Sequence, residues 1–198
     1  ARNGLDVDDL WDRKIADDFG DHLRLAGAEK ILDVAFAHPI KLIVNALGVP
    51  PDAMMARARA KGVAAGALTG AKEPALKHAE AGVDILIVSG TEAGGHCGEV
   101  STLVLVPEEL EAVAPYGGIE VLAAGGIATG RQMAACMAMG AAGAWAGSVW
   151  LTTVEAETTP TVKRKMLAAS SRNTVRSRSR TGKPTRQLQS AWRSEEHT

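Results

Sequence analysis

The stretch VDILIVSGTEAGGHCG, residues 83–98, decides the fold. It begins with branched apolar residues between Val83 and Val88, a composition typical of a strand buried on both faces of a parallel sheet. It then changes to a glycine-rich loop that carries Glu92 and His96. A rigid strand followed by such a loop often holds a titrating side chain over a ligand, so His96 is a candidate functional residue. A solvated histidine in a flexible turn is the alternative.

The same pattern repeats along the chain. Short apolar segments begin near residues 42, 63, 83, 119 and 143, and a helix-forming segment follows each. Repeated β-α units of this kind predict an α/β fold with a parallel sheet, which is either doubly wound or closed into a barrel. The dinucleotide fingerprint G-x-G-x-x-G would favour the doubly wound form, but neither of the glycine pairs at 94–95 and 125–126 fits that spacing.

Glycines stand at the ends of the last three predicted strands. Gly94 and Gly95 follow one strand, Ala124, Gly125 and Gly126 end the next, and Gly147 and Ser148 lie in the last, which is predicted over 142–149. In a (β/α) barrel all these ends lie on the face that carries the active site. Backbone N–H groups at glycines and the serine hydroxyl can approach phosphate oxygens, so the pattern predicts a phosphate site. Tight turns without a ligand are the alternative.

Three motifs carry a family resemblance. GTEAGGHCG at 90–98, LAAGGIATGRQMAACMAMGAAGAWAGSVWL at 122–151 and VNALGVPP at 44–51 resemble the nitronate monooxygenase (2-nitropropane dioxygenase) family. The resemblance covers roughly residues 41–192 and implies an FMN-binding (β/α)8 TIM barrel. It implies that His96 is catalytic and that FMN is bound by the strand-end residues Gly94, Gly95, Ala124, Gly125, Gly126, Gly147 and Ser148.

The implied reaction is oxidation of a nitronate or nitroalkane by molecular oxygen. His96 would act as the base that removes the acidic proton beside the nitro group, or would hold the nitronate. A flavin-dependent enoyl-acyl-carrier-protein reductase looks similar in the same motifs, and a non-catalytic flavin- or phosphate-binding module is a further alternative. Cys97 adjoins His96, but adjacent side chains in an extended turn point apart, so we predict no nucleophilic cysteine.

Family barrels have eight strands and five can be identified here, so we expect the last five β-α units, with the first three strands lying before Ala1. The predicted organisation is a helical lead-in over 1–40, the barrel segment over 41–157 and a basic helical and loop tail over 158–192. The final RSEEHT, 193–198, resembles a translated sequencing adapter and is left out of the fold prediction.

Charge is divided unevenly along the chain. Residues 1–157 carry 12 Lys and Arg against 21 Asp and Glu, whereas residues 158–193 carry 10 Lys and Arg and no acid. We expect the basic tail to pack on the acidic body and to bind no nucleic acid, since it lacks interleaved aromatic residues. No apolar run is long enough for a membrane span, and the two cysteines indicate neither a metal site nor a disulfide framework, which favours a cytoplasmic protein.

Overall fold

The computed structural model describes residues 25–178 and 182–189, which form two compact units. The first unit contains helices α3 (Leu25–Ala37) and α4 (Asp52–Lys61). In this unit the Arg57 guanidinium pairs with Asp33, and Lys61 Nζ donates a hydrogen bond of 3.0 Å to the carbonyl of Phe36. Most of the predicted lead-in, residues 1–24, and the terminal segment 193–198 lie outside the described residues.

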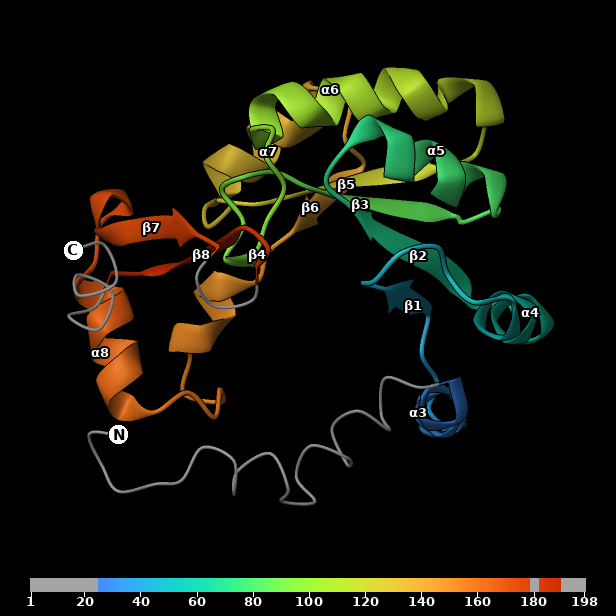
Figure 1. Cartoon of the computed structure of the whole chain (residues 1–198), viewed down its shortest axis with the longest axis horizontal. Helices are drawn as coiled ribbons and strands as arrows, with labels where there is room; N and C mark the ends of the chain where they lie inside the picture. Colours follow the sequence, from blue (N-terminus) through green and yellow to red (C-terminus); the bar gives the residue numbers. More distant parts are fainter. Residues whose placement is uncertain (1–24, 179–181, 190–198) are drawn as a thin grey trace. The chain divides into compact units, whose positions relative to one another are not determined.

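The second unit is built on a parallel sheet of five strands, coloured from blue to orange in Figure 1. Its strands, in spatial order, are β1 (Leu42–Asn45), β2 (Ala64–Thr69), β3 (Ile85–Ser89), β5 (Glu120–Ala124) and β6 (Gly143–Trp145). The spatial order follows the chain order without a reversal. A doubly wound sheet reverses its order at a switch point, so the sheet has the topology of a barrel segment.

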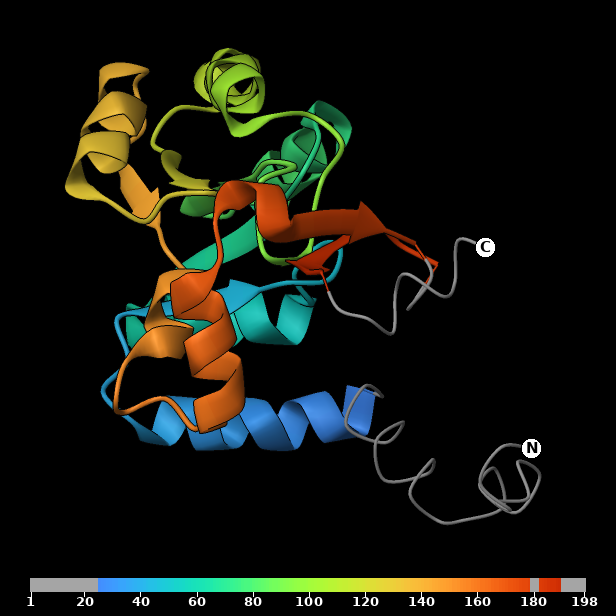
Figure 2. The same cartoon turned by 90° about the vertical axis from the view of Figure 1, so that its left-hand side faces the viewer.

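Helices α5 (Lys72–Glu80), α6 (Thr102–Val113) and α7 (Gly130–Ala138) lie along one face of this sheet (Figures 1 and 2). The helix α6 packs on both β3 and β5. Large apolar side chains of these three elements are no more than 1% exposed, namely Leu86, Ile87, Val88, Leu105, Val106 and Val121. Each such burial stabilises the fold by about 1.5–3 kcal/mol, which explains why the apolar run at 83–88 organises the unit.

Two titratable side chains are buried between α5, α6 and β2. Glu109 is 0% exposed; its Oε1 lies 3.4 Å from Thr69 Oγ1, and its Oε2 has no partner among the described residues. Burial raises the pKa of Glu109 to about 8, and the nearby Glu108 adds to the rise. Burial also lowers the pKa of His78, despite a hydrogen bond with the backbone of Leu68. Both groups are therefore held in their neutral forms near neutral pH.

Two predicted elements have different bounds in the structure. After the glycine-rich loop the sequence predicts a short helix from Pro107 to Val113, whereas α6 begins at Thr102 and Pro107 lies inside the helix. β6 ends at Trp145, so the predicted strand over 142–149 is too long. Ser148 instead begins a 3-10 helix, η2 (Ser148–Thr152), whose Trp150 indole donates a 2.9 Å hydrogen bond to the carbonyl of Ala146. This turn ends the strand.

The tail contains strands as well as the predicted helix and loop. Helix α8 (Pro160–Ala168) and the short η3 (Ser171–Asn173) are followed by β7 (Thr174–Ser177) and β8 (Thr185–Leu188), which pair antiparallel. β8 also pairs with β4 (Gly95–His96), so a second sheet has the order β4-β8-β7. The tail thus reaches the loop that carries His96. No helix in the two described ranges is long and apolar enough to cross a bilayer.

Candidate active site at the strand ends

The three glycine-bearing strand ends converge. A β-carbon added to Gly94 would lie 2.3 Å from Ser148 Oγ, so the loop after β3 lies directly against the end of β6. One added to Gly126 would lie 2.9 Å from the β-carbon of Glu92, so the same loop also lies against the end of β5. The ends of β5 and β6 therefore both lie against the loop that follows β3.

The turn after β5 depends on glycine. Gly125 and Gly126 have φ of +104° and +71°, a region that side-chain-bearing residues rarely adopt. A β-carbon at Gly125 would also lie 2.9 Å from Thr102 Oγ1, so the start of α6 leaves no room for one. Beside it, Gly90 N donates a 3.1 Å hydrogen bond to the carbonyl of Ala124, which ties the end of β3 to that of β5.

Glu92 joins this turn to helix α6. Its Oε2 accepts hydrogen bonds from Thr102 N at 2.9 Å and from Thr102 Oγ1 at 2.8 Å. Ser101, the residue before the helix, makes no capping hydrogen bond, so the Glu92 carboxylate satisfies the helix N-terminus instead. Burial by itself would raise the pKa of Glu92, but the bonds from Thr102 and the attraction of Arg186 outweigh it and lower the pKa below its usual value.

His96 is exposed in the two-residue strand β4, opposite Thr185 of β8. The next residue continues this pairing, because Cys97 N donates a 3.1 Å hydrogen bond to the carbonyl of Pro184. Cys97 Sγ lies 3.8 Å from the same carbonyl, so the thiol faces the tail. The backbone at His96 is therefore held by a segment that lies far along the chain.

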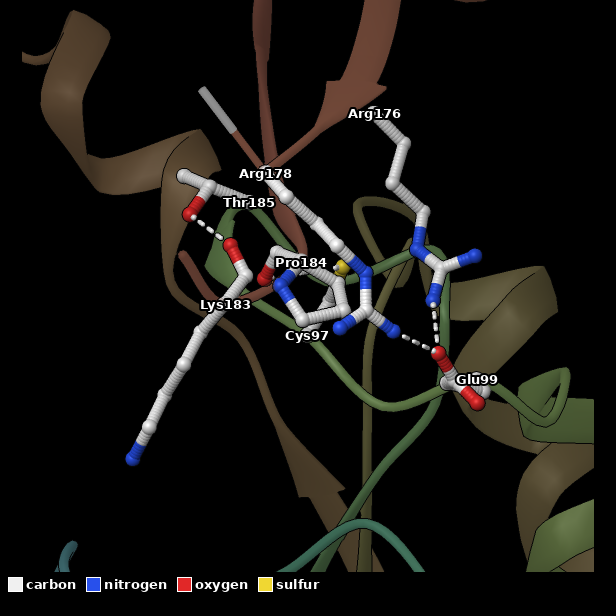
Figure 3. A network of polar contacts seen from close by, with 7 residues as sticks. All are labelled: Cys97, Glu99, Arg176, Arg178, Lys183, Pro184 and Thr185. Atoms are coloured by element: carbon white, nitrogen blue, oxygen red, sulfur yellow. Dashed lines mark hydrogen bonds and ion pairs between the residues drawn. The ribbon is translucent and has the colours of Figure 1, made fainter. Parts of the chain in front are cut away.

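The end of the loop is held by charge. Figure 3 shows Arg176 and Arg178 converging on Glu99, with nitrogen–oxygen distances of 3.5 Å and 2.6 Å. The side chain of Lys183 extends away from this cluster in the same view. These two arginines pack on an acidic residue of the body, as the uneven charge of the chain predicts.

The residues predicted to bind FMN differ in their exposure to solvent. Gly95 and Gly147 are exposed, and a β-carbon added to either would meet no atom within 4 Å, so these positions stay open to a ligand. Ala124 is buried and contributes its carbonyl to the Gly90 hydrogen bond. Sequence reasoning missed Thr102 and Arg186, since neither stands in one of the quoted motifs and the hydrogen bonds that each makes to the loop form only in the folded chain.

Comparison with known proteins settles the family. The family model for nitronate monooxygenase matches residues 5–198. The chain belongs to the nitronate monooxygenase family. The resemblance predicted from the motifs is thus confirmed, and the five β-α units are a segment of a TIM barrel, since the nitroalkane oxidase structure from Streptomyces ansochromogenes superposes with a TM-score of 0.74. That match has 31% identity and covers 86% of this chain and 51% of that chain.

Two curated relatives show how much of the family's length is present. The "Putative monooxygenase Rv1533" of Mycobacterium tuberculosis is 58% identical over 89% of this chain and 46% of its own length. A (3aS,4S,5R,7aS)-5-hydroxy-7a-methyl-1-oxo-octahydro-1H-indene-4-carboxyl-CoA dehydrogenase of Rhodococcus jostii is 37% identical over 86% of this chain and 47% of its own length. The chain therefore spans about half the length of these two relatives.

Proposed function

We propose that this chain supplies the phosphate-binding strand ends and the catalytic histidine of an FMN-dependent nitronate monooxygenase. The observation that carries the proposal is the contact between Gly94 and Ser148, which brings two predicted cofactor-binding loops together two residues before His96. Family membership supports a flavin-dependent oxidoreductase. The complete enzyme, its substrate and its use of oxygen are part of this proposal.

The residues at the strand ends fit a phosphate group. Gly126, Gly147 and Ser148 are exposed, and together they offer backbone N–H donors and a hydroxyl, the donor types that cradle phosphate oxygens. Gly147 is the residue before η2 and Ser148 is its first residue, a position where N–H groups lack partners within the helix. We therefore assign the FMN phosphate to these three residues. Bound FMN supplies the electron transfer between substrate and oxygen.

His96 is assigned the proton chemistry. A nitroalkane has an acidic C–H bond beside its nitro group, and a neutral imidazole accepts such a proton when it lies within hydrogen-bond reach. If the substrate arrives as the nitronate anion, the same imidazole donates a hydrogen bond to it instead. Both roles need His96 exposed at the strand ends, and its exposure in β4 supports this.

The test uses the full-length protein and its flavin absorbance, with oxygen consumption measured on a nitronate and on a nitroalkane. We expect bound flavin, and a fall in kcat of about 100-fold or more for His96→Ala, the usual contribution of a general acid–base residue. His38→Ala, which removes an exposed histidine from the first unit, is the matched control. Folded protein without flavin contradicts the cofactor assignment, and full turnover by flavin-loaded His96→Ala contradicts the role of the histidine.

A second candidate is flavin-dependent oxidation or reduction of an acyl thioester. The Rhodococcus jostii relative is named as a CoA-ester dehydrogenase, and the motifs also resemble those of enoyl-acyl-carrier-protein reductases. Turnover of an enoyl thioester with NADH or NADPH, without oxidation of nitronates, would favour this candidate over the first. The two assays on one preparation therefore separate them.

A further inference from the structure

Three contacts from the C-terminal hairpin, β7 and β8, hold the loop that carries His96. At the start of the loop, Arg186 Nε donates a 2.9 Å hydrogen bond to the carbonyl of Thr91. In the middle, Gly95 and His96 pair with Arg186 and Thr185 of β8. At the end of the loop, the Glu99 carboxylate pairs with Arg176 of β7 and with Arg178, which follows that strand.

We propose that Arg186 is a positioning residue for His96: the Arg186 guanidinium fixes the loop and the β8 strand against one another. The inference rests on the proposed function, in which His96 does the proton chemistry. Arg186 Nη1 also donates a 3.0 Å hydrogen bond to Thr174 Oγ1, so one guanidinium joins the start of the loop to both strands of the hairpin.

The loop needs such support because its own strand is minimal. β4 has two residues and lies between Gly94 and Gly98, and so short a strand has little stability unless it is paired. A planar guanidinium can donate to two acceptors in fixed directions, whereas a lysine ammonium is a single flexible point. Arg186 is half-buried, so its bonds are better shielded from water than the exposed ion pairs at Glu99.

Arg186 also acts on Glu92, the residue next to Thr91. Its positive charge favours the ionised form of Glu92, and that carboxylate holds the N-terminus of α6 through Thr102. Because the Nε hydrogen bond acts on Thr91 and the charge acts on Glu92, while the Nη1 hydrogen bond anchors the guanidinium to Thr174 of β7, loss of Arg186 should release residues 91–96 while the core around β3 stays packed. A displacement of about 1 Å in a catalytic group can lower a rate by about 100-fold.

The experiment compares Arg186→Gln, Arg186→Lys and Lys183→Gln in the full-length, flavin-loaded protein. Lys183→Gln is the matched control, since it removes one positive charge from the same hairpin at a side chain that points away from the loop (Figure 3). Three quantities are measured for each variant: amide hydrogen exchange of the peptide covering 91–97, kcat and KM separately, and flavin content.

For Arg186→Gln we expect amide exchange at 91–97 to become about 10-fold faster or more and kcat to fall by about 10-fold or more. KM and flavin content should stay close to the parent's. Arg186→Lys should recover part of both losses, and Lys183→Gln should match the parent. Unchanged exchange in Arg186→Gln overturns the proposal, as does faster exchange with unchanged kcat. If Arg186→Gln fails to fold, equal kcat in the parent and Arg186→Lys overturns it. Activity retained by His96→Ala would instead overturn the proposed function, without altering the exchange result.

Discussion

The buried carboxyl of Glu109 makes the stability of this protein depend on pH. It is 0% exposed, and burial raises its pKa from the ordinary 4.5 to about 8. Between these two values the folded protein holds a proton that the unfolded chain has released. The free energy of unfolding therefore falls as the pH rises through this range and levels off above the folded pKa. Glu109→Gln removes the titration and changes the shape of the side chain little.

The size of the effect follows from the two pKa values. One proton contributes about 1.4 kcal/mol per pH unit, so Glu109 should remove about 3 kcal/mol of stability between about pH 5 and about pH 7.5. The difference in unfolding free energy between Glu109→Gln and the parent should shift by that amount in favour of the variant. Contributions of other groups, such as His78, cancel in this difference. A constant offset is expected as well, because the amide brings N–H donors into a buried site where the Glu109 side chain has one partner in the described part of the chain, Thr69 Oγ1.

The assay is urea denaturation of both proteins followed by circular dichroism, at several values between about pH 5 and about pH 7.5. Glu108→Gln is the control, because it removes the adjacent but exposed carboxylate of the same helix. Its curve should run parallel to the parent's within a few tenths of a kcal/mol. Parallel curves for Glu109→Gln would refute the reasoning, since they would mean that the buried carboxyl has an ordinary pKa.

Three further changes test the site and its supports. Thr102→Val leaves the Glu92 carboxylate with one donor fewer, and thermal unfolding should show a loss of about 1–3 kcal/mol; an unchanged midpoint would contradict the helix-capping role. Gly125→Ala places a methyl group 2.9 Å from Thr102 Oγ1 at φ +104°, so it should lower the free energy of unfolding by about 1–3 kcal/mol and reduce flavin retention. Gly118→Ala, at φ +69° with no atom within 4 Å, should show the cost of backbone strain alone. An equal loss of stability in both variants would contradict the steric argument. Because burial lowers the pKa of His78, stability should fall as the pH drops below the ordinary 6.5, and urea denaturation should show that His78→Leu lacks this fall; identical acid slopes would argue against it.

The repeated β-α pattern could be predicted because its signals are local. The apolar run before Gly90 has the composition of a buried strand, and the structure places β3 at the centre of the sheet. Element ends were harder to predict, since contacts from elsewhere set them. α6 starts at Thr102 because Glu92 caps it, and β6 stops before Ser148 because that residue turns to meet Gly94.

The sequence by itself determined the parallel β-α architecture, the family and the set of glycine-bearing strand ends, since apolar runs and glycine turns act within a few residues. Only the tertiary structure decided how the loop of His96 is held. The sequences of β4 and β8 are each too short and too polar to predict a strand, and their pairing joins segments almost a hundred residues apart. The hydrogen bonds of Arg186 exist only after that long-range pairing has formed, so no local pattern of residues could predict them.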